Sequence, residues 1–179
     1  MIKKKFDKKK GILFWITGLS GSGKTSIAKK IKKNIVKEFG PTIVVSGDDL
    51  RKIFGFKQYD EKSRIILSRK FCKFAKFVTD QKINLIFAIV GLMNEPRKWN
   101  KKNIKNYVEI YIKANLQKII NLGKKKIYKF QKKNKIVGVN IHPEFPKKPD
   151  IVIHNNFLKN TNYLSEELFK KIKNRYSLI

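Results

Sequence analysis

Short apolar runs alternate along the chain with longer stretches in which apolar residues recur every three or four positions. The run at residues 11–17 is almost continuously hydrophobic, which is typical of a strand buried on both faces. Apolar residues between 27 and 35 recur at helical spacing, and Gly40-Pro41 predicts the end of that helix. A second helix is predicted over residues 61–79. Strands are predicted at residues 11–17, 42–45, 83–90, 108–112 and 150–153.

Strands separated by helical stretches predict an α/β fold with a five-stranded parallel sheet and helices on both faces. The length of 179 residues and a hydrophobic content of 41% suit one domain covering residues 1–179, with a basic N-terminal tail at residues 1–10. No apolar run approaches the roughly 20 residues that a membrane-spanning helix needs, so no membrane partner is expected.

A glycine-rich segment between the first predicted strand and the first predicted helix fits the pattern G-x-x-x-x-G-K-[ST]. Glycines let consecutive backbone N–H groups turn toward phosphate oxygens, and the start of the following helix adds further donors. The pattern therefore predicts a nucleoside triphosphate site in which Lys24 reaches the β- and γ-phosphates and Thr25 ligates Mg²⁺. The residues expected to bind ATP are Gly18, Leu19, Ser20, Gly21, Ser22, Gly23, Lys24, Thr25 and Ser26.

The glycine-rich loop predicts nucleotide binding but does not by itself predict which reaction the protein catalyses. A GTPase needs an N-K-x-D segment, and the nearest string, Asn-Lys-Lys-Asn at 100–103, lacks the aspartate. A motor or helicase needs more chain than 179 residues. The remaining interpretation is a small kinase that moves the γ-phosphoryl group to a small acceptor.

The glycine loop with its flanks at residues 14–25, the string Ser-Gly-Asp-Asp-Leu-Arg at 46–51 and the segment 143–152 together resemble adenylylsulfate kinases. The resemblance runs from about residue 11 to residue 155. It implies a P-loop NTPase fold, Mg²⁺ with ATP as phosphoryl donor, and transfer to the ribose 3′-hydroxyl of adenylyl sulfate in sulfate assimilation. A homodimer is expected, because that family often forms one.

Site roles are carried over where residue types agree. By resemblance, Asp48 orients the acceptor hydroxyl or a Mg²⁺-bound water, and together with Lys24 it forms the predicted catalytic pair. The alternative for Asp48 is an N-cap of a short following helix, which is compatible with catalysis. Arg51 matches an arginine that holds the acceptor's anionic group, and Phe56 matches an aromatic that stacks on the acceptor base, with a core phenylalanine as the alternative.

Residues 123–136 are rich in lysine and match the family's lid, which closes over both nucleotides. Within it, Lys126 and Lys129 are the lysines chosen as facing phosphate. The residues predicted to bind the acceptor are Asp48, Arg51, Phe56, Arg64, Lys126, Lys129 and Ile136.

The chain departs from the family pattern mainly on the acceptor side. Ser46 replaces the first aspartate of the D-G-D string, and Gly91 replaces a serine that some members carry. Glu61 and Arg64 stand where acceptor-contacting arginine and asparagine are expected, and Ile136 replaces an aromatic. Such changes alter which conjugate fits. The alternative acceptor is another nucleotide conjugate, such as the cytidine diphosphoramidate used in capsule modification.

The chain carries 43 lysines and arginines against 13 acidic residues, a net charge of +30. This charge raises a third hypothesis, a nucleic-acid-binding ATPase. Lysines far outnumber arginines and no RNA-binding signature appears, so the charge is interpreted as a solvated surface and nucleic acid is not expected as a partner. The single cysteine, Cys72, excludes an internal disulfide and favours the cytoplasm.

Overall fold

The computed structural model describes residues 3–124, 128 and 135–178. Its centre is a parallel sheet of strands β2 (Ile12–Thr17), β3 (Thr42–Ser46), β4 (Asn84–Ala88), β5 (Asn106–Lys113) and β6 (Ile151–His154), in the order β3-β4-β2-β5-β6. The predicted α/β fold with a five-stranded parallel sheet is confirmed. The predicted strand at 83–90 is shorter in the structure, because the chain leaves the sheet after Ala88.

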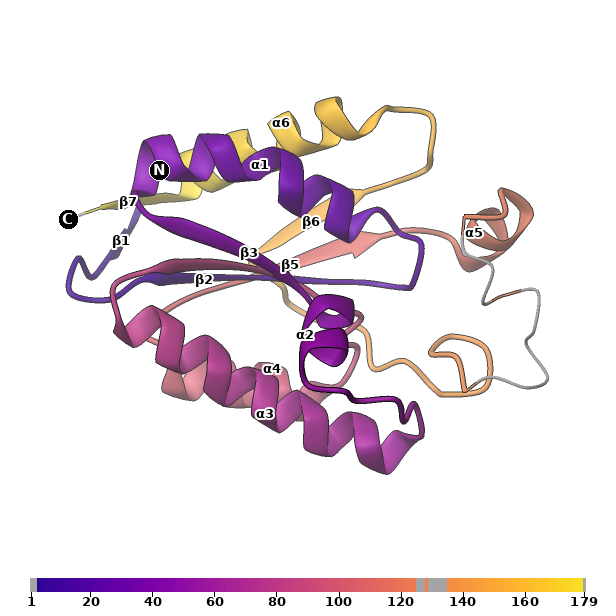
Figure 1. Cartoon of the computed structure of the whole chain (residues 1–179). Helices are drawn as coiled ribbons and strands as arrows, with labels where there is room; N and C mark the ends of the chain where they lie inside the picture. The colour runs from indigo at the N-terminus through magenta and orange to yellow at the C-terminus, as the bar shows by residue number, and fades with distance from the viewer. Residues whose placement is uncertain (1–2, 125–127, 129–134, 179) are drawn as a thin grey trace.

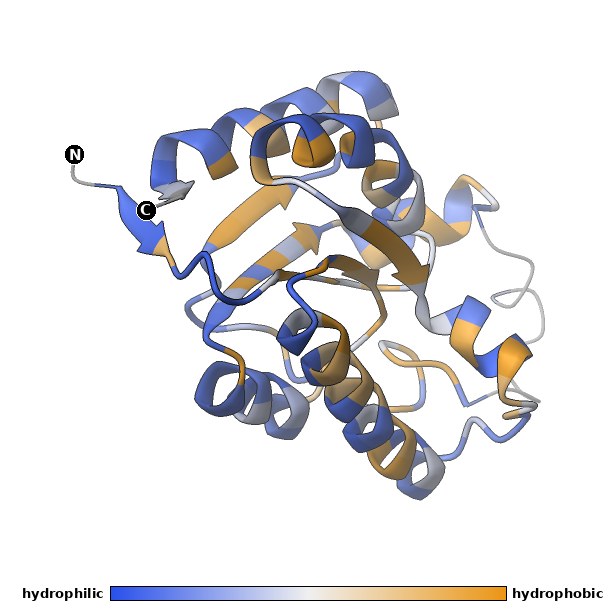
Figure 2. Ribbon diagram, turned by 60° about the vertical axis from the view of Figure 1, so that its left-hand side comes forward, coloured by the Kyte–Doolittle hydropathy of each residue, from blue (hydrophilic) through white to orange (hydrophobic). Residues whose placement is uncertain are grey.

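Helices cover both faces of this sheet (Figure 1). α1 (Lys24–Phe39) and α6 (Thr161–Arg175) pack on one face, and α3 (Glu61–Asp80) and α4 (Asn94–Asn103) lie on the other. Successive side chains of β2 point to opposite faces, so Phe14 joins the core beneath α1 while Trp15 joins the core beneath α3. Figure 2 shows the result as largely hydrophobic strands between helices whose outer sides are hydrophilic.

The order of the strands determines where a ligand fits. β4 and β5 flank the central β2 on opposite sides, so the chain changes direction across the sheet at β2. In open α/β sheets a ligand binds at such a switch point, beyond the carboxyl ends of the strands. Two short helices, α2 (Gly47–Ile53) and α5 (Leu116–Asn121), follow β3 and β5 at that edge.

The chain ends add a second, two-stranded sheet. β1 (Lys4–Phe6) pairs in parallel with β7 (Tyr176–Leu178), and the ring of Phe6 stacks on Tyr176 at a centroid distance of 4.8 Å. Part of the segment that the sequence presents as a basic tail is therefore ordered against the C-terminal residues. None of the helices in the described part of the chain has the length and apolar character that crossing a bilayer requires.

Candidate active site

The glycine loop connects β2 to α1 through close backbone packing. A Cβ atom on Gly18 would lie 2.5 Å from the carbonyl oxygen of Ile112, so no larger residue fits there without a shift of the backbone. Gly23 precedes α1 with a φ of 93°, a left-handed conformation that favours glycine. These two positions explain why the loop pattern requires glycine at its first and last glycine sites.

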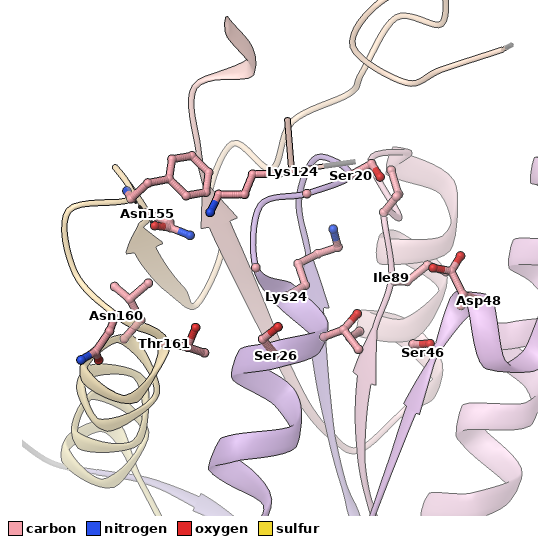
Figure 3. Close-up of a pocket in the computed structure, with 18 of the residues that line it drawn as sticks. Ser20, Lys24, Ser26, Ser46, Asp48, Ile89, Lys124, Asn155, Asn160 and Thr161 are labelled. Atoms are coloured by element: carbon pink, nitrogen blue, oxygen red, sulfur yellow. Dashed lines mark hydrogen bonds between the residues drawn. The ribbon is translucent and has the colours of Figure 1, made fainter. Parts of the chain in front are cut away.

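A cavity of about 630 Å³, here called the P-loop cavity, opens over this loop (Figure 3). Its walls come from the glycine loop, the start of α2, the end of β4 and the segment that leads into α6. Of the predicted ATP-binding residues, Ser20, Gly21, Gly23, Lys24, Thr25 and Ser26 line it. The side chains of Leu19 and Ser22 are buried behind the loop instead.

Lys24 is the lysine of the glycine-loop motif, and it is 7% exposed. Its Nζ donates a hydrogen bond to the carbonyl oxygen of Leu19 at 2.7 Å. Figure 3 shows its side chain between the wall that carries Asn155 and the wall that carries Asp48. The ammonium group is thus already held at the loop that is expected to receive a polyphosphate.

Asp48 stands at the start of α2 without acting as its cap. Ser46 is the N-cap, because its hydroxyl accepts from the Asp49 N–H at 3.1 Å while the Asp49 carboxylate accepts from the Ser46 N–H at 2.9 Å. The hydroxyl and backbone N–H of Ser46 lower the pKa of Asp49, so its carboxylate stays ionised. The alternative role of Asp48 as an N-cap is therefore wrong, and its side chain is left to the cavity.

A second cavity of about 320 Å³, here called the arginine cavity, adjoins the first. The residues that line both cavities are Ser20, Gly47, Asp48, Ile89 and Val90, and Asp48 is the ionisable residue among them. Arg51 and Arg64 line the second cavity, and both guanidinium groups lie against the ring of Tyr59, at 4.3 and 5.4 Å from its centroid.

The two guanidinium groups are held by backbone oxygens rather than by carboxylates. Arg51 donates to the carbonyl of Gln58 at 2.7 Å, and Arg64 donates to the carbonyls of Tyr59 and Lys135 at 2.7 and 2.9 Å. Burial lowers the pKa of Arg64, and the neighbouring charge of Arg51 lowers it further. No carboxylate among the described residues forms an ion pair with either group, although Asp48 acts on the charge of Arg51 and Asp60 on that of Arg64. The two guanidinium groups on the cavity wall are therefore suited to an anionic ligand.

The structure does not bring Phe56 to the arginine cavity. Its ring packs on the α3 side of the sheet, lines a separate cavity of about 140 Å³ and has the Lys70 ammonium 5.0 Å from its centroid. Phe56 is therefore not among the residues that line the arginine cavity, and its stacking on the acceptor base stays a prediction, while Tyr59 and Phe71 are aromatic residues on the cavity wall. Ile136 lines the same cavity as predicted, whereas Lys126 and Lys129 lie outside the described residues.

Two side chains that the sequence analysis did not single out support the site. The hydroxyl of Tyr128 donates to the carbonyl of Ser20 at 2.9 Å, which ties the predicted lid segment to the glycine loop. Arg97, 5% exposed, pairs with Glu109 at 2.9 Å and donates to the carbonyl of Gly91 at 3.1 Å. Arg97 thereby holds the loop after β4 that lines the arginine cavity.

Side-chain oxygens suited to Mg²⁺ are available where the two cavities meet. No group of three or more histidine, cysteine or acidic side chains forms a metal site among the residues described. In nucleotide kinases Mg²⁺ keeps several waters and is held by one or two side chains together with the phosphates. Thr25 and Asp48, both on the wall of the P-loop cavity, fit that kind of site.

A parallel sheet with a glycine loop at its switch point, and two adjoining cavities that share an aspartate, define a P-loop kinase that acts on a small acceptor. The family model for adenylylsulphate kinase matches residues 10–154. The chain therefore belongs to the adenylylsulphate kinase family and is a phosphotransferase.

The chain is similar to relatives with two different names. A cytidine diphosphoramidate kinase of Campylobacter jejuni is 36% identical over 163 residues, which cover 89% of this chain and 95% of that protein. An adenylyl-sulfate kinase of Clostridium acetobutylicum is 31% identical over 159 residues, which cover 84% of this chain and 78% of that protein. Among solved structures, the Mycobacterium tuberculosis APS kinase in complex with AMPPNP and APS superposes with a TM-score of 0.80 at 21% identity, covering 92% of this chain and 98% of that chain, which shows the shared fold.

Proposed function

We propose that the protein transfers the γ-phosphoryl group of ATP to the ribose 3′-hydroxyl of a nucleotide conjugate, and that cytidine diphosphoramidate is its acceptor. The observation that carries the kinase geometry is the position of Asp48 on both cavities. ATP in the P-loop cavity and an acceptor in the arginine cavity present the γ-phosphate and a sugar hydroxyl to the same carboxylate. Cytidine diphosphoramidate is favoured by the 36% identity to the Campylobacter jejuni enzyme over nearly all of its length.

Charges around the acceptor side support this choice. A third cavity of about 570 Å³ shares Arg64, Gly91 and Met93 with the arginine cavity, and Glu61 lines it. A conjugate therefore has room to extend past the arginines toward a carboxylate. Glu61 accepts hydrogen bonds, so it can accept from the N–H of a terminal amidate, whereas a terminal sulfate has no donor to offset its repulsion by the carboxylate.

Adenylyl sulfate is the second candidate acceptor. It is favoured by the family description and by the 31% identical Clostridium acetobutylicum relative. A terminal sulfate offers no hydrogen-bond donor to the carboxylate of Glu61. Ile136, in place of an aromatic residue, leaves one face of a purine without a stacking partner.

Phosphoryl transfer requires positioning and charge neutralisation more than a strong base. In the proposed reaction the glycine loop and Lys24 hold the triphosphate, and Asp48 orients the 3′-hydroxyl toward the γ-phosphorus and accepts its proton as the bond forms. Arg51 and Arg64 hold the acceptor's phosphates. Mg²⁺ held at Thr25 would neutralise charge on the β- and γ-phosphates. A homodimer stays an expectation.

The test is an acceptor screen with the purified protein, Mg-ATP and coupled detection of ADP. We expect turnover with cytidine diphosphoramidate and a kcat/KM at least tenfold lower with adenylyl sulfate. Turnover with adenylyl sulfate alone would contradict the assignment of the acceptor and leave the kinase geometry intact.

Substitutions of two arginines on α3, measured in the same assay, test whether the acceptor binds in the arginine cavity. Arg64→Ala should raise the acceptor KM about tenfold or more while the ATP KM changes less than twofold, because a charge-assisted contact contributes roughly 1.5–3 kcal/mol. Arg69→Ala is the matched control, since Arg69 is on the same helix, is exposed and pairs with Glu95 outside the arginine cavity. Equal effects of the two substitutions would argue against this location.

A further inference from the structure

Asn155 connects three segments of the chain and has no role in the reaction proposed above. It follows the last residue of β6, is 7% exposed and lines the P-loop cavity (Figure 3). Its backbone N–H donates to the carbonyl of Lys113 at 2.8 Å, which fixes the residue to the end of β5. A buried amide held in this way has its side-chain direction set by the sheet.

The amide nitrogen of Asn155 faces the glycine loop. Nδ2 donates to the carbonyl of Ser22 at 3.0 Å, a buried bond across 133 positions of sequence. The C=O and N–H groups of a planar trans peptide point in opposite directions, so holding the Ser22 carbonyl on Asn155 directs the Gly23 N–H away from Asn155. A Cβ atom on Gly23 would lie 3.1 Å from this Nδ2, so the absence of a side chain at Gly23 permits the contact.

The amide oxygen of Asn155 holds the opposite wall of the same cavity. Oδ1 accepts from the backbone N–H of Phe157 at 2.9 Å. Phe157 has a φ of 66°, a left-handed conformation that is unfavourable for a non-glycine residue and therefore needs support from its surroundings. The ring lines the P-loop cavity, with the ammonium of Lys124 5.7 Å from its centroid.

We propose that Asn155 is a positioning residue for the phosphoryl donor. One amide group sets the glycine loop for the triphosphate and sets Phe157 as an aromatic platform for the purine base of ATP. Binding of the phosphates and binding of the base are then coupled through a single side chain that touches neither the acceptor nor the reacting atoms.

Asn155→Ala removes both side-chain hydrogen bonds, and Asn155→Asp keeps an oxygen for the Phe157 N–H but cannot donate to Ser22. We expect both to raise the ATP KM at least tenfold with less than a twofold change in the acceptor KM. Asn156→Asp is the matched control for charge, because Asn156 is the next residue, is exposed and bonds only to the Leu158 N–H in the described structure. A rise in both KM values, or an unchanged ATP KM, would overturn the proposal.

Binding of inorganic tripolyphosphate, measured by calorimetry at moderate salt, distinguishes the role of Asn155 at the glycine loop from its role at Phe157. Asn155→Ala should weaken tripolyphosphate and ATP alike, whereas Phe157→Leu should weaken ATP several-fold and leave tripolyphosphate unchanged, since stacking acts only on the base. Phe157→Leu keeps an apolar side chain and the Asn155 bonds, so it tests the platform even if Asn155 variants fold poorly. Equal losses for both ligands in Phe157→Leu would contradict the platform, and unchanged tripolyphosphate binding in Asn155→Ala would contradict the role at the glycine loop.

Discussion

Lys24→Ala is expected to lower kcat/KM by about a thousandfold. The ammonium group of Lys24 lies at the glycine loop and is only 7% exposed, so its charge acts on bound phosphate with little screening by water. Removing one preorganised stabiliser of transition-state charge costs about 10²–10³ in rate, and Lys24 also contributes to holding the ground-state triphosphate.

The measurement is steady-state kinetics with varied ATP, combined with a thermal unfolding midpoint that shows whether the variant is folded. Lys30→Ala is the matched control, because Lys30 is an exposed lysine on the same helix. Retention of more than a tenth of wild-type kcat/KM by folded Lys24→Ala would contradict the assigned role.

Asp48→Asn is expected to lower kcat by about 10²–10⁴ while the ATP KM changes little. Asparagine keeps the size of the side chain and the ability to line both cavities, but it cannot accept the proton of the attacking hydroxyl. Since Ser46 and Asp49 form the cap of α2 without Asp48, the helix should persist in this variant.

Asp49→Asn is the comparison that separates chemistry from folding. It removes the carboxylate of the capping box and should lower the free energy of unfolding by roughly 1 kcal/mol, with a much smaller effect on kcat. Equal reductions of kcat by Asp48→Asn and Asp49→Asn would contradict the catalytic role of Asp48, because Asp48 would then act through the helix rather than on the acceptor.

The central sheet is predictable from the sequence because β2 and β4 are buried on both faces and form continuous apolar runs. The pairing of β1 with β7 was not, since Lys4 and Lys5 are exposed and resemble a solvated tail. Phe6 is 1% exposed because Tyr176, from the other end of the chain, stacks on it and Phe39 packs against its edge. A contact between residues so far apart in the sequence produces no pattern of apolar and polar positions in either segment.

The candidate site also has a part that the sequence predicts and a part that it does not. The glycine loop is a contiguous motif, so its residues were found from spacing, and they line the expected cavity. The sequence does not show which aromatic residue faces the arginine cavity. A turn in which the Phe56 N–H donates to the Arg51 carbonyl at 2.9 Å leaves Phe56 on the α3 side, and both guanidinium groups lie against the ring of Tyr59.

A residue such as Asn155, which supports the glycine loop from a distant part of the chain, is not identified by a sequence motif. The hydrogen bond from Asn155 to Ser22 joins the end of β6 to the glycine loop across 133 positions, and asparagine is common in this chain, so nothing in the sequence distinguishes this one. The contact follows from the order of the strands, in which β5 lies beside β2 and β6 lies beside β5.

The most direct test of the central claim is a ³¹P NMR spectrum of the product formed from Mg-ATP and cytidine diphosphoramidate. The account predicts a new phosphomonoester resonance coupled to the ribose 3′ proton, formed in equal amount with ADP, and its absence when the acceptor lacks the 3′-hydroxyl. Inorganic phosphate as the only product from ATP, or a phosphate on any other atom of the acceptor, would contradict it.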